Sequence, residues 1–479
     1  MKTKLIIALI VMMLIPWMAE PESNDFQKLP VIHAEGMRFV DSSGREVILR
    51  GVNAGGRSKL PPFFPFDPVP DFNAALERYA DNIQAMGFNV VRLIIIYEAA
   101  EPVRGKYDED YLKKYDQMIS AFAKRGVYVF VDAHQDLFSR RFCGDGFPDW
   151  EIPEKYRTRR QHADCKNWGL VDFTYPLSTT LDRFWENQNG IQDSYVAFFK
   201  MLAERYKNEP GVIGFEPINE PFPGLKARMS ISHWYGSQLF PLYEKVGQAV
   251  QSVDSRFLIF ADIFPLENPV LWTTKRPRPK IINLVFAPHY YDFGTYGMML
   301  GSAFEKKFMQ KSLKRHKSLA QKWDTPVLIG EWGISPLYPG AAGYITSLNS
   351  VYDDLKISHT FWEASISPTI WNMENTSVFN PDGSIREEAL ALDRPYPKAV
   401  AGTIKSFSFD AGSKRFEMLW DEDPKISAPT EIHLPSRIFK SSPNFGLEPM
   451  GNYSFNPATR IFRVFPLQTP GQRKIIITQ

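Results

Sequence analysis

The stretch "GVIGFEPINEP" at residues 211–221 begins as a buried strand would and ends in charged and rigid residues. Its first half is apolar, with Val212 and Phe215, whereas its second half contains two glutamates, an asparagine and two prolines. Proline has no N–H to donate to a sheet, so Pro217 indicates that the strand ends and a loop begins there. The stretch therefore predicts a strand with carboxylates at its carboxyl end.

The same arrangement recurs along most of the chain. Short apolar runs alternate with segments of helical apolar spacing, such as residues 72–86, and a second such segment at residues 112–122 is followed by a helix-stopping glycine, Gly126. The expected strands are at residues 46–53, 88–96, 127–136, 211–221, 257–263, 284–292, 326–333 and 358–365. Eight apolar strands separated by helices predict an α/β fold, a parallel sheet closed into a (β/α)8 TIM barrel. An open doubly wound sheet is the alternative, but it brings a glycine-rich phosphate-binding turn, and no glycines here have that arrangement.

The pattern changes after residues 394–403. Short alternating runs such as "FEMLW" and "KIIITQ" follow, separated by proline, glycine, asparagine and serine. Such runs predict antiparallel strands. The sequence therefore predicts a catalytic barrel at residues 30–394 and a small C-terminal antiparallel β-sandwich domain at residues 395–479.

The first residues, 1–20, are typical of a secretory signal peptide. Two lysines precede an apolar run at residues 5–17, which is too short to span a bilayer. A signal anchor is the alternative, and bulky Trp17 leaves the cleavage point open. Export implies an oxidising compartment, in which Cys143 and Cys165 are candidates for one disulfide. The protein is therefore expected to be secreted, with membrane association as an alternative location.

The composition is that of a globular protein, with 44% apolar and 23% charged residues, which excludes a disordered chain. Aromatic residues make up 14% of the chain, more than a core needs, which fits platforms on which rings stack. The formal net charge is +2, and no block of lysine and arginine occurs. Nucleic acid is therefore not an expected partner.

Polar residues stand at the expected carboxyl ends of the strands, which in a barrel surround one pocket. They are Arg92, His134, Asp136, Asn219, Glu220, His289, Tyr291 and Glu331. Each alone has an ordinary explanation, such as a core ion pair for Arg92, but burying so many polar groups together requires partners. Two glutamates from different strands supply the acid and the carboxylate that glycoside hydrolysis needs. Since two carboxyl groups suffice for both steps, no cofactor and no metal is predicted.

Four motifs at these strand ends resemble glycoside hydrolase family 5: "RL" on the second strand, "NEP" on the fourth, "H-x-Y" on the sixth and "GEWG" on the seventh. The resemblance implies that Glu220 is the acid/base and Glu331 the nucleophile. The further implied site residues are Asn219 at the sugar 2-hydroxyl, His289 beside the acid, and Arg92 and Tyr291 beside the nucleophile. A cation and a phenol favour the ionised form of Glu331, whereas nearby negative charge keeps Glu220 protonated. Glu216 is interpreted as structural.

A narrower resemblance covers the chain from about Gly51 to its end. The segments "HQDLFSRRFCGDGFPDW" (134–150) and "NAGGRSKLPP" (53–62), with the β domain after the barrel, resemble the endoglycoceramidases of family 5. This resemblance implies that Lys59, His134 and Asp136 contact sugar hydroxyls. It also implies a tryptophan platform at the end of the eighth strand, for which Trp362 and Trp371 are candidates and Trp362 is preferred.

The leading hypothesis is a secreted retaining endo-β-glycosidase that hydrolyses the linkage between oligosaccharide and ceramide in glycosphingolipids. The alternatives are another family 5 β-glycosidase, either a glucanase or a glucosidase of lipid glucosides, and a noncatalytic protein that binds glycans or membranes. The expected partners are a glycosphingolipid substrate and, transiently, a membrane or micelle surface. A monomer is expected.

Two apolar loops at the expected barrel mouth suggest where a lipid lies. They are residues 59–72 and 290–304, and both contain or follow proposed sugar contacts. Burial of these loops against their own domain is the alternative. The predicted walls of a lipid groove beside Glu220 are Phe63, Phe64, Phe66, Tyr296, Met298, Met299 and Leu300.

Overall fold

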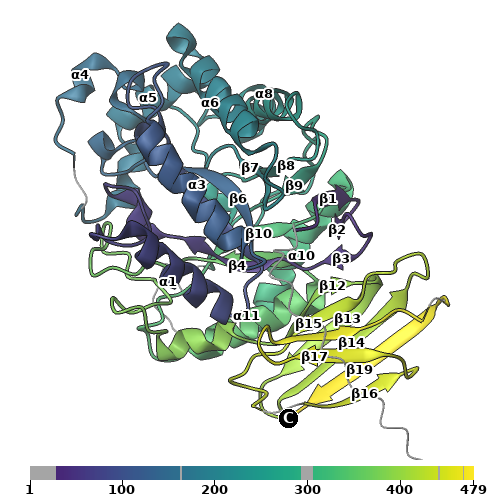
Figure 1. Cartoon of the computed structure of the whole chain (residues 1–479). Helices are drawn as coiled ribbons and strands as arrows, with labels where there is room; N and C mark the ends of the chain where they lie inside the picture. The colour runs from purple at the N-terminus through teal and green to yellow at the C-terminus, as the bar shows by residue number, and fades with distance from the viewer. Residues whose placement is uncertain (1–28, 162–163, 293–305, 441–442, 468) are drawn as a thin grey trace, which may run out of the picture.

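The computed structural model describes residues 29–161, 164–292, 306–440, 443–467 and 469–479. The predicted leader at residues 1–20 lies outside these described residues. So do four residues of the predicted lipid groove, namely Tyr296, Met298, Met299 and Leu300. The described chain forms a barrel and a smaller β-rich part, whose C-terminal strands are coloured green to yellow and whose first strands are purple in Figure 1.

Eight parallel strands form the barrel, in the order β10-β11-β4-β5-β6-β7-β8-β9. They are β4 (Arg50–Ala54), β5 (Val90–Ile96), β6 (Tyr128–His134), β7 (Val212–Glu216), β8 (Leu258–Ala261), β9 (Leu284–Phe286), β10 (Leu328–Trp332) and β11 (Ser358–Phe361). Parallel bridges from Phe286 to Val327 and from Tyr290 to Trp332 join β9 to β10 and close the sheet. Each strand overlaps a predicted one, and the prediction of a TIM barrel is confirmed.

Helices cover the outside of the barrel (Figure 1). The long ones are α1 (Phe72–Ala85), α3 (Glu109–Ala123), α5 (Tyr175–Trp185), α6 (Ile191–Tyr206), α8 (Phe240–Gln251), α10 (Lys306–Trp323) and α11 (Ala341–Leu355). The short ones are α2 (Tyr97–Ala100), α4 (Glu154–Arg157) and α7 (Ile231–Trp234). Asp71 and Asp108 cap α1 and α3 by accepting hydrogen bonds from backbone N–H groups of the first turn. After α3 the chain turns at Gly126, whose φ of +71° is in the left-handed region.

Alternation along the barrel strands separates an inner from an outer set of side chains. On β5, Val91 packs in the core between strands and helices, whereas Val90 packs with Phe130 inside the barrel. The lower interior of the barrel is thus apolar. Charged side chains begin one layer above it, with Arg92 on β5 and Asp132 on β6, both fully buried.

The β-rich part consists of two antiparallel sheets. One has the order β1-β2-β3-β12-β15-β18-β17 and the other β13-β14-β19-β16. The strands are β1 (Ile32–Glu35), β2 (Arg38–Asp41), β3 (Glu46–Val47), β12 (Tyr396–Val400), β13 (Gly402–Asp410), β14 (Arg415–Glu422), β15 (Thr430–His433), β16 (Asn444–Glu448), β17 (Tyr453–Asn456), β18 (Ile461–Val464) and β19 (Gly471–Thr478). Side chains of both sheets, such as Met418 and Ile432, share one core, which agrees with the predicted antiparallel sandwich.

The first three strands belong to this sandwich, although the sequence prediction assigned residues 30–394 as a whole to the barrel. Val47 of β3 pairs with Ala399 of β12 in an antiparallel register. Glu46 and Val47 are thus not part of the first barrel strand, which the sequence predicted at residues 46–53 and which begins at Arg50. Runs of two to four residues carry no local signal for the sheet that they join. The predicted division of the chain at residue 394 stays a prediction.

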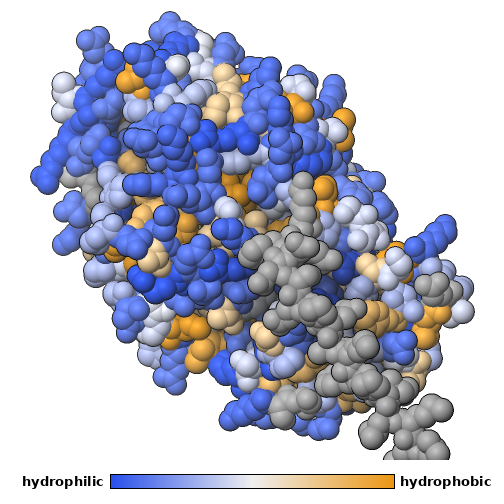
Figure 2. All heavy atoms as spheres, viewed as in Figure 1, coloured by the Kyte–Doolittle hydropathy of each residue, from blue (hydrophilic) through white to orange (hydrophobic). Residues whose placement is uncertain are grey.

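The surface of the barrel part is mostly polar on the face shown in Figure 2, with apolar residues in small separate areas. In α10, for example, Met309 and Leu313 are buried while Lys307 and Lys311 are exposed. Among the described residues, no helix combines the length and the apolar character needed to cross a membrane.

We predict that a fragment ending at residue 394 is insoluble. Its loss of β12 would leave β3 paired with β2 alone, with its other edge open, and would expose Ile48, which packs in the sandwich core. It would also remove the Tyr396 ring, which lies 4.8 Å from the buried guanidinium of Arg50. The measurement is the fraction of protein that stays in solution after ultracentrifugation, with the full chain as control. A soluble fragment 30–394 with full activity would show that the two parts do not depend on each other.

Candidate active site

Two carboxyl groups, those of Glu220 and Glu331, lie close together at the carboxyl end of the barrel. Glu331 belongs to β10, and Glu220 follows the end of β7. One oxygen of each and a ring nitrogen of His289 all lie within 4.8 Å of one another. The Glu331 side chain is 7% exposed and the Glu220 side chain 23% exposed. The pair is therefore sheltered yet open to a ligand.

The guanidinium of Arg92 lies beside Glu331 and is completely buried. Its Nη1 donates to Glu331 Oε1 at 2.6 Å, and its Nη2 donates to Asn219 Oδ1 at 2.8 Å. Glu216 accepts from Nε and Nη2 at 2.8 and 2.9 Å, and Asp132 Oδ2 is 3.1 Å from Nη2. Glu216 is itself fully buried and holds Arg92 by these two hydrogen bonds, as its structural interpretation implies.

Tyr291 completes the surroundings of Glu331. Its hydroxyl donates to Glu331 Oε2 at 3.0 Å, while Arg92 donates to the other oxygen. Both oxygens thus have a donor, which orients the carboxyl group and stabilises negative charge on it. An anion held in this way is suited to attack an electrophilic carbon above it.

Glu220 has a different environment. His289 Nδ1 lies 2.9 Å from Glu220 Oε1, and the Asn268 amide donates to the same oxygen at 3.1 Å. Burial, aided by the negative charge of Asp136, raises the pKa of Glu220 to about 7. Burial lowers the pKa of His289 to about 3, so this ring is neutral at pH 7. Glu220 is therefore poised to give and take a proton near neutral pH.

The Glu220 backbone is held in an uncommon conformation. Its φ of +39° lies in the left-handed region, which costs free energy for a residue with a side chain. Its N–H donates to Asp262 Oδ2 at 2.8 Å, and its carbonyl accepts from the Gln135 amide at 3.3 Å. These bonds fix the direction in which the side chain points.

A second cluster of predicted residues lies around the ammonium of Lys59. Its Nζ is 2.6 Å from Asp136 Oδ2 and 3.1 Å from Glu374 Oε2. It also lies over the rings of Trp362 and Trp371, at 4.4 and 4.1 Å from their centroids. Both candidates for the tryptophan platform therefore contact the same cation, and the preference for Trp362 stays a prediction.

His134 connects the two clusters. Its ring stacks on Trp362 at 5.3 Å between centroids, and its Nδ1 is 2.7 Å from Asp132 Oδ2, the oxygen that also meets Arg92. Burial acts against the charged ring, but the carboxylates of Asp132 and Asp136 raise the pKa of His134 to about 10. All ten predicted catalytic and sugar-site residues thus lie in one connected network, while their roles toward a substrate stay predictions.

In the described part of the chain, three groups of side chains are compact enough to bind a metal ion. They are His134, Asp136 and Asp145; Glu216, Asp262 and His289; and Glu220, His289 and Glu331. In each group, however, a protein cation already contacts one of the carboxylates: Lys59 for the first and Arg92 for the other two. One carboxylate of each group therefore has compensating charge from a side chain. That no metal is needed stays a prediction.

The predicted lipid groove is wrong for Phe64 and Phe66. They are only 4% and 6% exposed, because they pack against helix α1 and its start. Phe64 contacts Phe72 at 5.1 Å between ring centroids, and Phe66 contacts Tyr79 at 5.8 Å. An apolar loop beside the apolar side of a helix is stabilised more by this burial than by exposure. Phe63 is half-buried and packs against the apolar cluster of Ile94, Ile96 and Trp362.

Sequence reasoning missed several residues of the network. Asn53 ends β4 and accepts from Arg92 at 2.9 Å, and Asp262 follows β8. Both stand at strand ends, so a search of every strand end for polar residues would have found them. Asp132 precedes His134 by two residues, and strand alternation could have placed it on the same side. Asn268 lies in a loop and has no such signal.

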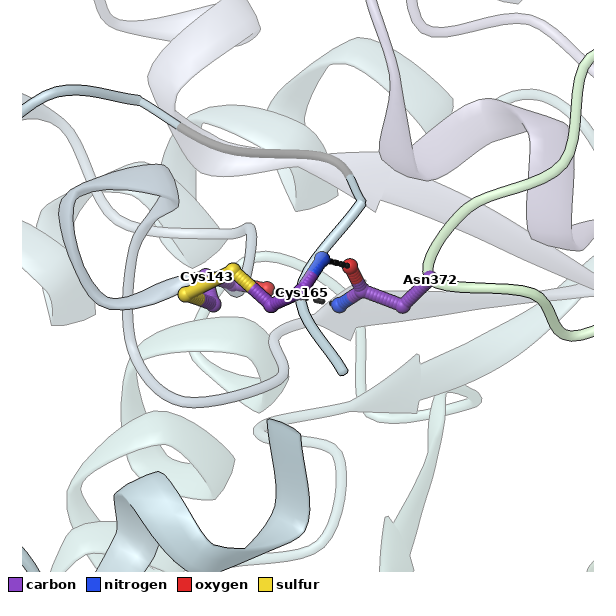
Figure 3. The surroundings of a disulfide bond; sticks show 3 residues. All are labelled: Cys143, Cys165 and Asn372. Atoms are coloured by element: carbon purple, nitrogen blue, oxygen red, sulfur yellow. Dashed lines mark hydrogen bonds between the residues drawn. A yellow bond between two sulfur atoms is a disulfide. The ribbon is translucent and has the colours of Figure 1, made fainter. Parts of the chain in front are cut away.

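The cysteines form the predicted disulfide. Cys143 and Cys165 are bonded, with their Cα atoms 6.0 Å apart, and both lie in the long loop after β6 (Figure 3). The bond closes a segment with a sequence separation of 22. This segment lies at the same end of the barrel as the two glutamates.

The barrel holds two sheltered carboxyl groups at the carboxyl ends of its strands. One lies beside an arginine and a tyrosine, and the other has a raised pKa. This combination defines a glycoside hydrolase site. The model for "Cellulase (glycosyl hydrolase family 5)" matches residues 40–376, and the model for the glycoside hydrolase family 5 C-terminal domain matches residues 394–477. The chain belongs to glycoside hydrolase family 5 and is a glycoside hydrolase.

Individual relatives agree with the narrower resemblance. An endoglycoceramidase of Cyanea nozakii is 27% identical over 443 residues, which cover 83% of this chain and 82% of that protein. A glucosylceramidase of Aspergillus fumigatus is 30% identical over 257 residues, 42% of this chain and 34% of its own. The structure of endo-glycoceramidase II from a Rhodococcus species in complex with ganglioside GM3 superposes with a TM-score of 0.76 at 23% identity, covering 93% of this chain and 99% of that one, and shares the fold.

We predict that kcat/KM falls as the pH rises through about 7, the pKa of Glu220. The acid must be protonated to act, so activity is present below this pKa and is lost above it. The measurement is a pH profile on an aryl β-lactoside with a poor leaving group. Glu220→Gln should abolish the alkaline limb and spare a substrate with an activated leaving group, which needs no proton. An unchanged alkaline limb in this variant would assign the titration to another residue.

Proposed function

We propose that the protein is a retaining endo-β-glycosidase that cleaves glycosphingolipids between the oligosaccharide and ceramide. The similarity to endoglycoceramidases over most of both chains supports the substrate class. The geometry supports the retaining mechanism, because an oxygen of Glu220 and one of Glu331 lie within 4.8 Å of each other. Retaining enzymes have their carboxyl groups about 5 to 5.5 Å apart, whereas inverting enzymes leave room for a water between them.

The two steps use the two carboxyl groups in turn. In the first step Glu331 attacks the anomeric carbon while Glu220 gives its proton to the glycosidic oxygen, so ceramide leaves as an alcohol and a glycosyl ester forms. In the second step Glu220, now ionised, takes a proton from water. The water oxygen bonds to the anomeric carbon, and the ester bond to Glu331 breaks. Arg92 and Tyr291 receive the charge that returns to Glu331.

An aromatic row beyond Glu220 supports an apolar leaving group. Phe173, Phe222, Phe264 and Trp272 contact one another in sequence, with ring centroids 5.6, 4.9 and 5.8 Å apart. The outer two, Phe173 and Trp272, are 56% and 52% exposed, whereas Phe222 and Phe264 are buried and support them. Phe222 is two residues from Glu220, and the acid/base stands on the side of the leaving group. We place the ceramide against the exposed outer rings of this row, Phe173 and Trp272, instead of in the groove that the sequence predicted.

Side chains next to the row support a transient contact with a lipid surface. Met229 is 94% exposed, and Leu225 and Leu266 are 43% and 47% exposed, on the loops after β7 and β8. Lys226 is exposed, and the Arg228 guanidinium lies over two rings of the row. Exposed apolar residues beside cations suit a bilayer with anionic headgroups.

We also propose that the protein is secreted. Residues 1–20 have the pattern of a signal peptide. The disulfide between Cys143 and Cys165 supports this location, because such bonds persist in oxidising compartments.

A lipid β-glucosidase is the second candidate. The local similarity to a glucosylceramidase favours it, because that enzyme is named for a lipid with a single sugar. The two candidates differ in what they release. An endoglycosidase releases an intact oligosaccharide, whereas a glucosidase releases a single sugar.

We predict that the purified protein converts a ganglioside to free oligosaccharide and ceramide, which mass spectrometry of both products detects. Proton NMR should show that the released sugar first appears as the β anomer, as double displacement requires. Glu331→Gln is the control and should release neither product, since no other group can form the ester. Release of single sugars would favour the glucosidase, and an initial α anomer would contradict retention.

We predict that Phe173→Ser with Trp272→Ser raises KM for a ganglioside about tenfold or more, because each buried methylene contributes about 0.8 kcal/mol. Hydrolysis of a water-soluble aryl lactoside should change little. Both side chains are exposed, so folding should be preserved. Met450→Ser, an exposed change in the β-rich part, is the matched control. An equal loss of activity on the lipid and on the soluble substrate would show that the aromatic row is not part of the lipid site.

A further inference from the structure

The disulfide is tied to the opposite side of the site by one side chain, that of Asn372 (Figure 3). Asn372 lies in the loop after β11, whereas both cysteines lie in the loop after β6. Its Oδ1 accepts from the backbone N–H of Cys165 at 2.8 Å, and its Nδ2 donates to the backbone carbonyl of Cys143 at 2.8 Å. One amide therefore bonds both halves of the cystine. Both bonds can form together only while the two cysteines are held side by side.

The residues on either side of Asn372 reach the cation of the sugar cluster. The Trp371 ring lies 4.1 Å from Lys59 Nζ, and Glu374 Oε2 lies 3.1 Å from it. Trp168, three residues after Cys165, contacts Trp371 at 5.0 Å between ring centroids. The loop that contains the disulfide and the loop that contains Asn372 thus meet directly behind Lys59.

We propose that Asn372 is a positioning residue through which the Cys143–Cys165 disulfide holds Trp371 and Glu374 against Lys59. Affinity for the sugar portion of the substrate then depends on the oxidised state of the disulfide, while the carboxyl pair, held by Arg92, does not. The inference rests on the proposed function only in taking Lys59 as a sugar contact. A reductant that opens the disulfide should therefore weaken substrate binding.

An ordinary structural disulfide would behave differently. Such a bond acts mainly by restricting the unfolded chain, so its loss lowers stability without changing the folded site. The positioning role instead predicts a higher KM at unchanged kcat. It also predicts that removing the Asn372 amide has the same effect while the disulfide remains intact.

The backbone conformation of Asn372 allows a substitution that removes the side chain without straining the backbone. Its φ of +43° lies in the left-handed region, which asparagine and glycine accept more readily than other residues. Asn372→Gly therefore removes the two hydrogen bonds and keeps the backbone conformation. Asn283→Gly is the matched control, because Asn283 also has a positive φ of 51° and donates to a backbone carbonyl, that of Ser255, but lies before β9, at the other end of the barrel.

The experiment compares the oxidised protein, the protein treated with dithiothreitol, and the two glycine variants. Dithiothreitol supplies two electrons and two protons, which convert the disulfide to the thiols of Cys143 and Cys165 while the reagent closes to a cyclic disulfide; alkylation and mass spectrometry count the thiols. KM and kcat are measured on an aryl β-lactoside. Hydrogen exchange is followed in the peptide that contains residues 368–376, with β13 as the internal reference.

We expect reduction and Asn372→Gly each to raise KM about tenfold, the effect of losing a contact of ordinary strength, with kcat and β13 exchange unchanged. Exchange in residues 368–376 should quicken in both, and Asn283→Gly should match the unaltered protein. Asn372→Asp keeps the acceptor for Cys165 and should recover part of the loss. Unchanged KM, or exchange that quickens equally in β13, would overturn the proposal. If the unaltered protein hydrolysed no lactoside, the proposed function would fail, and the exchange data alone would still decide on the positioning role.

Discussion

The buried guanidinium of Arg92 is the contact on which the rest of the site depends. A charge inside a barrel is costly unless it is paired, and here Glu216, Asp132 and Glu331 supply the pairing from three different strands. Because the same group reaches Glu331, the position of this carboxyl group, the proposed nucleophile, is set by the barrel interior and not by a loop. The apolar layer beneath, which includes Phe130, keeps water from competing for these bonds.

Two kinds of surroundings meet between Glu220 and Glu331. Toward Lys59 the walls are charged and aromatic, with carboxylates and indole rings around one ammonium, an arrangement suited to sugar hydroxyls and ring faces. On the side of Phe222 an aromatic row ends in two exposed rings, Phe173 and Trp272, where we propose that the lipid lies. A substrate with a sugar portion and an apolar leaving group matches these two sides of the site. The pKa of Glu220, between the two sides, is raised by burial and by the negative charge of Asp136 in the cluster around Lys59.

The barrel and its paired glutamates were predictable because each leaves a local pattern, an apolar run that ends in polar residues. Other features depend on contacts between distant segments and leave none. Phe64 and Phe66 look like groove walls until the helix that covers them is known. Asp262 ends its strand without a motif around it, so it was overlooked although it holds the backbone of Glu220. Strands as short as β3 gave no sign of which sheet they would join.

The place of β1–β3 has a consequence for how the chain is made. Arg38 of β2 bonds Thr403 of β13 across 365 residues of sequence, and β12 is the neighbour of β3 on the side away from β2. As the ribosome produces the chain from its amino end, the first strands emerge able to pair with one another, but the outer edge of β3 has no strand to join. They must wait until nearly the whole barrel has been synthesised, and such edges invite pairing with other chains in the meantime. The last segment to be translated therefore completes a sheet begun by the first, so that a truncated product exposes its own beginning.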